Sequence, residues 1–408
     1  MKESLFAVSF LFLFAATPAP GLAGEGLFPL DLKVARDMHD EAHVAVRMQH
    51  LETNATAPQG LSLPPSAASS LKFAKWVTPM AKEGFLWMAV GRSTANGEYD
   101  TLYVDANGDG SVADETAAKA YEAKDRYSRF GPVRVTFPGG DKPAEYYLNV
   151  YCRRYPGLVP ARGGNERTEG VMLFISSGCW REGAVRIGDK EYKCSLFDYN
   201  GNGTFNDTSM NPEEMDRIAV GAEDGAPRMG LGKYIRVSGA LYHPEPAPGG
   251  GFIRFTPADN VPMGKVKVNK DIGMFILTGE NGQFVFDSNN GPVEVPSGRW
   301  RPDAWRIERK DAKGEQWHLM GQGFPASSVF EVAEGEETSL ELGEPLKSAL
   351  HVGRSVGDSA GYVFEENLLG RSGETVKLVS AKTYGVPPKL RIRNADGTYD
   401  NTLPFEAG

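Results

Sequence analysis

The sequence predicts a mainly β, multi-domain protein, and two observations support this fold class. Apolar and polar residues alternate with a period of two along most of the chain, as they do in strands that bury one face. The 48 Gly and 27 Pro among 408 residues exceed the average for globular proteins and favour many turns. With 41% hydrophobic and 24% charged residues, the composition is that of a folded chain and not of a disordered one.

The first 23 residues have the pattern of a cleavable signal peptide. Lys2 precedes an apolar run from Leu5 to Ala16, which Pro18 ends. Gly21-Leu22-Ala23 then places small residues at the positions that signal peptidase reads. The run is shorter than the roughly 20 apolar residues that span a bilayer, and no later segment reaches that length. We therefore expect a mature protein that begins near Gly24, has no membrane span and is secreted or periplasmic.

Strand-like alternation recurs from residue 43 onward. Apolar Val44, Val46 and Met48 share one face of the first run. Turn residues such as Gly188-Asp189 separate the runs and are typical of tight hairpins. One stretch, Asp114–Lys124, is rich in Ala, Glu and Lys and predicts a helix. The other predicted strands are Phe85–Val90, Thr101–Val104, Val133–Phe137, Glu145–Tyr151, Val171–Ile175, Tyr192–Phe197, Tyr234–Leu241, Gly251–Phe255, Lys265–Val268, Met274–Leu277, Gln283–Phe286, Trp305–Arg309, Trp317–Met320, Ala360–Leu369, Thr375–Ala381 and Lys389–Arg393.

Length and turn composition divide the mature chain into three parts. We expect a β-rich domain over residues 24–260, a β-sandwich-like domain over 261–345 and a small C-terminal β region over 346–408. The Pro-rich segment Pro244–Gly250 is either a linker or the tip of a long hairpin, and the strands predicted on both sides of it favour the hairpin. The last part is too small to form a stable core alone, so it should pack on the middle domain.

The segment Asp105–Val112, called loop one below, has the ligand spacing of a calcium loop. Oxygen-bearing side chains occupy positions 1, 3 and 5, Gly110 at position 6 allows a sharp turn, and position 8 is apolar. Calcium is a hard cation that takes about 6–8 oxygen ligands, so the pattern suits Ca²⁺ better than zinc or copper. The predicted ligands are Asp105, Asn107, Asp109 and, through its backbone carbonyl, Ser111.

The same pattern returns in Asp198–Phe205, called loop two below, where Gly203 occupies position 6. A second loop in the same register strengthens the interpretation of the first. Loop two has one acid among its first five positions and loop one has two, so the sequence predicts weaker calcium binding by loop two. The predicted ligands are Asp198, Asn200, Asn202 and Thr204.

Both loops lack the bidentate glutamate that normally occupies position 12, where they have Thr116 and Ser209. Another acid therefore has to complete each site. For loop one the candidates are Asp114 and Glu115, and we favour Glu115. Both loops also follow a predicted strand in place of an entering helix, so calcium should staple the fold locally and not open a hydrophobic groove. For loop two we favour Asp207 over the other candidate acids, which are Glu213, Glu214 and Asp216.

These loops carry a resemblance to a known group of proteins. The strand and loop Tyr99–Gly110 and the second unit Leu196–Gly203 resemble those of uncharacterised secreted bacterial β-rich proteins with EF-hand-like (DxNxDG) calcium loops. The loops are also similar to those of dockerin and thrombospondin type 3 repeats. The resemblance covers about residues 85–220 and implies structural Ca²⁺. Separately, Val295–Trp300 resembles a turn of prealbumin-like, carboxypeptidase-regulatory β-sandwiches.

Charge and cysteine content limit the partners and the covalent chemistry. A net charge of −9 argues against a nucleic-acid binder, which needs a basic face. An oxidising compartment permits one disulfide among Cys152, Cys179 and Cys194, with three pairings open, and three reduced, buried thiols are the alternative.

No catalytic motif is present in the sequence. His39 and His43 have the spacing of a zinc-protease helix, but Asp40 stands where that chemistry needs a glutamate. We expect a non-catalytic, exported, calcium-stabilised binding or surface protein, whose unknown ligand is a carbohydrate or a cell-surface component. The alternative is a carbohydrate-active hydrolase or accessory protein with structural calcium, because a carboxylate pair cannot be recognised from sequence. Three tryptophans would then stack on sugars or fill the core: Trp300, Trp305 and Trp317.

Overall fold

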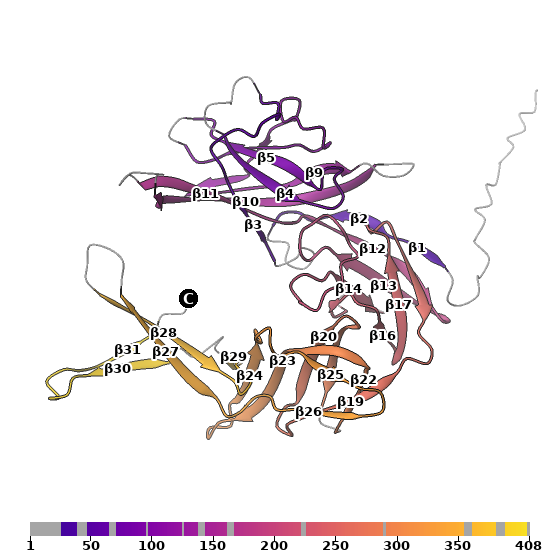
Figure 1. Ribbon diagram of the computed structural model, residues 1–408, viewed down its shortest axis with the longest axis vertical. Coiled ribbons are helices and arrows are strands. Elements are labelled where there is room, and N and C mark those ends of the chain that lie inside the picture. Colours follow the sequence, from indigo (N-terminus) through magenta and orange to yellow (C-terminus); the bar gives the residue numbers. More distant parts are fainter. Residues whose placement is uncertain are drawn as a thin grey trace, which may run out of the picture.

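The computed structural model describes residues 26–38, 47–64, 71–94, 97–124, 126–137, 143–160, 167–221, 226–288, 291–354, 361–380 and 388–405. Within these ranges it contains 31 strands and no helix, so the predicted mainly β fold with several sheets is confirmed. The strands form seven sheets, arranged along a curved molecule (Figure 1). The predicted signal peptide and Val44–Val46 lie outside the described residues.

Two sheets from the first half of the chain pack face to face at the top of Figure 1. They form because apolar residues alternate along long strands, whose inward faces meet between the sheets. One sheet has the order β4 (Lys72–Val77), β5 (Phe85–Gly91), β6 (Thr101–Val104) and β7 (Ala118–Lys119). The other has the order β3 (Gln49–Glu52), β11 (Arg167–Ser177), β10 (Ala144–Pro160), β9 (Tyr127–Phe137) and β8 (Glu122–Lys124).

Two further sheets continue the molecule below this pair (Figure 1). One has the order β15 (Met229–Gly230), β14 (Arg217–Gly221), β13 (Lys190–Phe197), β12 (Cys179–Ile187) and β2 (Asp31–Val34), with the predicted Gly188-Asp189 turn between β12 and β13. In the other, β17 (Ala240–Pro246) and β18 (Phe252–Pro257) pair antiparallel, so the Pro-rich segment belongs to a hairpin, in which Pro244–Pro246 end β17 and residues 247–251 form the tip. Its order is β1 (Leu27–Pro29), β18 (Phe252–Pro257), β17 (Ala240–Pro246) and β16 (Ile235–Val237).

The last three sheets contain the strands from Met263 onward. A three-stranded sheet has the order β22 (Val293–Pro296), β19 (Met263–Val268) and β26 (Glu337–Leu340), and its β19–β26 pair is parallel. The hairpin of β30 (Lys389–Arg393) and β31 (Asp400–Pro404) forms a sheet of its own. The largest sheet has the order β21 (Gly282–Asp287), β20 (Met274–Gly279), β23 (Gly298–Lys310), β24 (Gln316–Gln322), β29 (Thr375–Ser380), β28 (Tyr362–Leu369) and β27 (Lys347–Arg354), with β25 (Phe330–Val332) also on β23.

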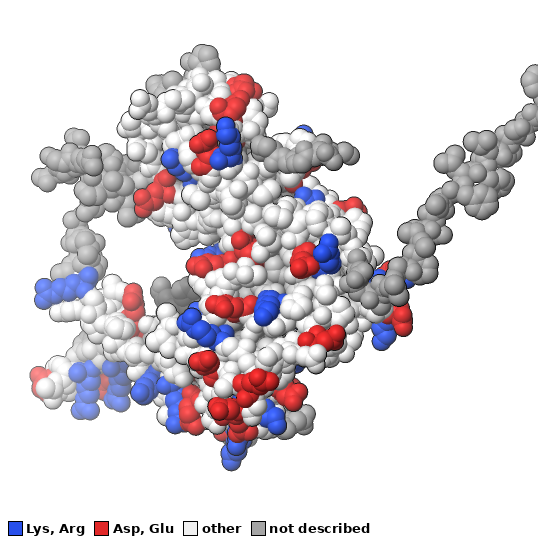
Figure 2. Space-filling model, turned by 45° about the vertical axis from the view of Figure 1, so that its right-hand side comes forward, with Lys and Arg blue, Asp and Glu red and all other residues white. Residues whose placement is uncertain are grey.

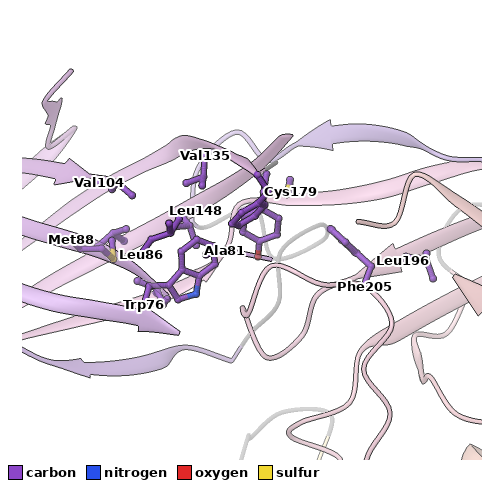
Figure 3. Packing of buried hydrophobic residues seen from close by; sticks show 14 of the residues in the cluster. Trp76, Ala81, Leu86, Met88, Val104, Val135, Leu148, Cys179, Leu196 and Phe205 are labelled. Atoms are coloured by element: carbon purple, nitrogen blue, oxygen red, sulfur yellow. The ribbon is translucent and has the colours of Figure 1, made fainter. Parts of the chain in front are cut away.

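Two large hydrophobic cores support these sheets. In the first, buried Trp76 stacks on Tyr146 with ring centroids 5.7 Å apart, and Figure 3 shows Trp76 among aliphatic side chains from both top sheets. In the second, the buried Trp300 indole donates a hydrogen bond to the Pro296 carbonyl (2.8 Å). Trp305 is also buried there and lies over Gly321, where a Cβ would come within 2.2 Å of the indole ring. Trp300 and Trp305 are therefore core residues.

Two local predictions are wrong. The segment Asp114–Lys124 is not a helix: β7 pairs with β6 and β8 pairs with β9, so tertiary pairing outweighs the helix propensity of its Ala, Glu and Lys residues. The segment Tyr234–Leu241 is not one strand, because Ser238 and Gly239 form a tight turn between β16 and β17 with positive φ (+49° and +89°). The alternation of apolar and polar residues continues through this turn, so the sequence pattern does not reveal the turn.

A polar network joins the two halves of the molecule. The Gln283 amide oxygen accepts hydrogen bonds from the Arg217 guanidinium (3.0 Å) and from the Gly230 amide (2.9 Å). The Gln283 amide nitrogen donates to the Asp303 carboxylate (2.6 Å), to which the Thr278 hydroxyl also donates (3.3 Å). Burial raises the pKa of Asp303, and this effect outweighs the attraction of Arg217 and the two hydrogen bonds.

This network predicts a pH-dependent contribution to stability. Because the folded state raises the pKa of Asp303 above its ordinary value, the unfolded chain loses that proton first as pH rises. The free energy of unfolding should therefore fall from about pH 4 upward until the folded-state pKa is passed. In Asp303→Asn this fall should be smaller, because the Asn amide does not titrate, while its oxygen can still accept the Gln283 hydrogen bond. Urea unfolding across that pH range measures it, and equal pH profiles for both proteins would contradict it.

All three cysteines are reduced and lie buried in the first core. Cys152 lies on β10, Cys179 begins β12, and Cys194 lies on β13. Burial raises the pKa of Cys179 and of Cys194 to about 12. Since the thiolate is the reactive form, these thiols should be inert while the protein is folded.

We predict that a thiol reagent such as dithionitrobenzoate labels none of the three cysteines at neutral pH in the folded protein. In guanidinium chloride without reductant, all three should react, because unfolding removes the burial that suppresses ionisation. The measurement is the absorbance of the released thiolate before and after denaturant. A single reactive thiol after unfolding would instead reveal a disulfide.

Candidate functional site

Loop one is anchored at both ends to the top sheets. The Asp105 amide donates to the Trp87 carbonyl on β5 (2.9 Å), and the Ala106 carbonyl accepts from Thr136 on β9 (2.8 Å). At the far end, Val112 is buried in a small apolar cluster with Leu71, Phe73 and Ala89. The apolar residue at position 8 therefore fixes the loop against the fold, as its place in the motif predicts.

Within loop one, the oxygen-bearing side chains accept hydrogen bonds from backbone amides of the same loop. The two carboxylate oxygens of Asp105 accept hydrogen bonds from the amides of Asp109 (3.0 Å) and Gly110 (3.1 Å). The Asn107 side-chain oxygen also accepts from the Asp109 amide (3.1 Å), and an Asp109 carboxylate oxygen accepts from the Ser111 amide (2.8 Å). All four residues predicted as ligands within loop one thus lie in one tight turn.

Glu115 contacts loop one. Its carboxylate accepts a hydrogen bond from the Ala106 amide at loop position 2 (2.8 Å). Burial raises its pKa, and the charges of Asp114 and Asp105 add to the effect. Burial also raises the pKa of Asp105, with a contribution from Asp109. Of the two candidate acids, Glu115 therefore lies against the start of the loop, whereas Asp114 is fully exposed with a lowered pKa.

Loop two begins with a buried carboxylate. Asp198, directly after β13, is fully buried, and its oxygens accept hydrogen bonds from the amides of Gly201 (2.6 Å) and Gly203 (2.6 Å). The Tyr146 hydroxyl from β10 donates to the same carboxylate (2.7 Å). The Trp76 indole from β4 donates to the Gly201 carbonyl (2.8 Å). Loop two is therefore packed against both top sheets.

Asp207 forms hydrogen bonds with three other predicted ligands of loop two. One of its carboxylate oxygens accepts hydrogen bonds from the side chains of Asn200 (3.1 Å), Asn202 (2.7 Å) and Thr204 (2.7 Å), which are loop positions 3, 5 and 7. Ser209, at position 12, instead donates to Glu214 (3.0 Å). Among the candidate acids, Asp207 is the one that contacts all three positions.

Asp216 is another candidate acid, and its two carboxylate oxygens hold backbone amides in place, as those of Asp198 also do. The Asp216 oxygens accept hydrogen bonds from Tyr199 (3.0 Å) and from Asp207 (2.8 Å). Asp216 is buried, and burial followed by the charges of Asp198 and Asp207 raises its pKa well above the ordinary value. Its bond to loop position 2 matches that of Glu115 in loop one, so both acids position a loop.

The electrostatics of loop two differ from the expectation based on sequence. Burial raises the pKa of Asp198 to about 7, and the charge of Asp207 adds to the effect against three favourable hydrogen bonds. The fold thus brings Asp207 and Asp216 to a loop that has one acid among its first five positions. The number of acidic side chains therefore no longer predicts that loop two binds calcium more weakly than loop one.

The chemistry of the donors fits a hard cation better than a transition metal. Both loops combine carboxylates with amide, hydroxyl and backbone carbonyl oxygens, the ligand types that calcium prefers. Across the described residues, no three His, Cys, Asp or Glu side chains form a metal-binding group. Neither loop has a His or a Cys among its eight residues.

A shallow groove of about 800 Å³ lies beside loop two. Asn200 and Asn202 form one wall, Gln49 and His50 of β3 form another, and the exposed acids Glu213 and Glu214 lie at the rim. The Gln49 amide donates to the Asn200 carbonyl (2.8 Å), and Arg47 forms an ion pair with Glu213 (3.1 Å).

Sequence reasoning did not find the residues from other strands that complete loop two. Tyr146 and Trp76 lie far from the loop in sequence, and both look like ordinary core aromatics in alternating strands. The only signal is that each carries a polar group that must find a partner when it is buried. No spacing rule connects them to Asp198.

Searches of protein-family models, of curated proteins and of solved structures found no match to this chain. In the part of the chain that the structure describes, no helix is long and apolar enough to cross a membrane.

The glycine at loop position 6 gives a matched test of how tightly loop two is packed. At Gly203 (φ +94°) a Cβ would lie 2.9 Å from the Thr78 hydroxyl and 3.3 Å from the Phe137 ring. At Gly110 (φ +83°), the same position in loop one, a Cβ would meet nothing within 4 Å. Both substitutions by Ala strain the backbone, but only Gly203→Ala also overpacks the core.

We therefore predict that Gly203→Ala lowers the free energy of unfolding by at least about 1 kcal/mol more than Gly110→Ala does. Chemical denaturation of the two variants beside the wild type measures the difference. Equal losses would show that loop two is no more tightly packed than loop one.

Proposed function

We propose that this chain is an exported, non-catalytic β protein whose two loops bind Ca²⁺, and that it acts as a calcium-stabilised binding or surface module. The observation that carries the proposal is the convergence of Asn200, Asn202 and Thr204 on one carboxylate oxygen of Asp207. Three ligand positions of a calcium motif are already gathered around an acid there. The pattern of residues 1–23 supports export to the secreted or periplasmic compartment.

Calcium would relieve the electrostatic cost of loop two. The carboxylates of Asp198, Asp207 and Asp216 repel one another, and two of them are buried. A divalent cation between the loop oxygens offsets this repulsion, and the Asn200 and Asn202 amides would turn their oxygens toward it. Asp198, Asn200, Asn202, Asp207 and the Thr204 carbonyl are the residues that would hold the ion. The folded state then binds calcium much better than the unfolded chain does.

A binding role fits the surface better than a sugar-hydrolysing role does. Of the three tryptophans that could stack on a sugar, Trp300 and Trp305 are buried in the second core, and Trp317 on β24 is half-buried. The groove beside loop two has an amide-rich wall and two rim acids, which suits a polar ligand such as a carbohydrate or a cell-surface component. The hydrolase alternative needs two carboxylates about 5–9 Å apart across a cleft, and Glu213 is engaged by Arg47.

Calcium should raise the melting temperature of the wild-type protein relative to chelator. With about 1 mM calcium and a dissociation constant near ~10⁻⁴ M, the linkage relation gives ~1.4 kcal/mol for each site. Asp109→Asn should remove loop one's share of the shift, Asp207→Asn should remove loop two's share, and the double variant should melt equally in both buffers. Glu213→Gln, an exposed acid beside loop two, is the matched control and should keep the full shift.

The experiment is a set of melting curves in calcium, in magnesium and in EGTA, with isothermal titration of calcium into the chelated protein. Magnesium should give a smaller shift, because it requires near-octahedral geometry and dehydrates reluctantly. A wild-type protein that melts at one temperature in all three buffers and releases no heat on titration would show that both loops are metal-free turns.

A further inference from the structure

The hairpin formed by β27 and β28, called the arm below, extends beyond the sheet to which it belongs. Eight residue pairs join β27 to β28, but only Leu369 pairs with Thr375 of the neighbouring β29. The rest of the arm therefore projects from the molecule as two strands (Figure 1). An isolated two-stranded hairpin is marginally stable in water, because it buries too little apolar surface. Burial of more apolar surface against a partner would therefore stabilise the outer part of the arm.

One face of the arm is apolar and exposed. Residues paired across the hairpin share a face, and Val352 pairs with Phe364 while Arg354 pairs with Tyr362. Leu350 lies on the same face, one level closer to the sheet. The exposed fractions of Leu350, Val352 and Tyr362 are 47%, 56% and 64%. Large apolar side chains grouped on one projecting face are typical of an interaction surface.

We propose that this face of the arm packs against the same face of a second copy of the chain, in a two-fold symmetric dimer. The charges on the face support this occupant. Arg354 lies on the outer part of the arm, and Glu366, which pairs with Leu350, lies nearer the sheet. When the two-fold axis lies at the level of Val352 and Phe364, the two arms are antiparallel to each other. This arrangement brings Arg354 within side-chain reach of the partner's Glu366, and symmetry repeats the contact.

The same charges disfavour pairing of the arms edge to edge. Joining β27 to a second β27 in full antiparallel register would place Lys347 opposite the partner's Arg354. Joining β28 to a second β28 would place Glu365 opposite the partner's Glu366. Like charges directly opposite one another destabilise a pair of strands. Packing of faces avoids both repulsions and covers the exposed apolar side chains.

The contact area is that of one short hairpin, so the dimer should be weak. Interfaces smaller than about 1,200 Å² in total belong to transient associations. We expect dissociation in the micromolar range or above, with dimers that populate at high protein concentration. Leu368 at the inner end of the arm packs against the second core, whereas Leu350, Val352 and Arg354 are exposed, so changes in the outer part of the arm should leave the fold of the rest intact.

Sedimentation equilibrium of the full mature chain, up to about 0.5 mM, tests the proposal. The wild type should approach twice the monomer mass with rising concentration. Val352→Asp should weaken association at least tenfold, since a charge enters the centre of the apolar face. Val77→Asp, at an exposed valine of β4 outside the arm, is the control and should associate like the wild type. The melting temperature of each variant reports whether it is folded.

A charge exchange distinguishes the two-fold geometry from other ways of covering the arm. Arg354→Glu and Glu366→Arg should each weaken the dimer, and the double variant should recover most of the wild-type association. A wild type that stays monomeric at every concentration overturns the proposal, as does association that the single charge changes leave untouched. A monomer that instead co-sediments with phosphatidylglycerol vesicles would assign the arm to a lipid surface and would also overturn it.

Discussion

The carboxylate of Asp198 accepts hydrogen bonds from three amides of its own loop and from the Tyr146 hydroxyl of another sheet. A buried charge needs such compensation, because transfer of a lone carboxylate into a protein interior costs several kcal/mol. The partners that compensate Asp198 are also the groups that join separate parts of the fold. Loop two lies where β13 ends, Tyr146 belongs to β10, and Trp76 of β4 donates to the same loop. Three sheets therefore meet around one acid.

Loop one has the same local chemistry but a different mechanical role. Its coil closes through Asp105 and Asp109, and its one large apolar residue, Val112, enters a small cluster and not the main core. A Cβ added at Gly110 would enter open space, whereas a Cβ added at Gly203 would meet Thr78 and Phe137. Loop one thus ties β6 to its neighbours, and loop two ties layers together. The same eight-residue motif has been placed in two structural contexts.

Much of the fold was predictable, because alternation and turn residues act locally. The alternating runs of the first half correspond to β5, β6, β9, β10 and β13, and the Gly188-Asp189 turn joins two strands as expected. The helix predicted over Asp114–Lys124 failed because Glu115 is held by the Ala106 amide and the residues after it pair with β6 and β9. Propensity is a weak local preference, and these contacts come from segments that are distant in sequence.

The candidate site shows the same division between local and distant information. The motif itself specifies the oxygens at positions 1, 3, 5 and 7 and the glycine at position 6, since these depend on the conformation of one short coil. The acid that follows is not fixed by spacing. Glu115 and Asp216 hold the same amide position of their loops, yet they lie at different distances along the chain. Tyr146 and Trp76 reach loop two only through the packing of the top sheets.

The pairing of β1 with β18 sets the order in which the chain can fold. Leu27 pairs with Arg254, so β1, the first of the described strands, has no partner until most of the first core has been made. A chain that emerges from its N-terminus must keep this segment unpaired throughout that interval. Contacts between residues so far apart in sequence slow folding, because the entropy of closing a long loop is lost before the contacts form. We therefore expect the sheet that contains β1 and β18 to be completed late in folding, when the segment near the start of the chain finally pairs.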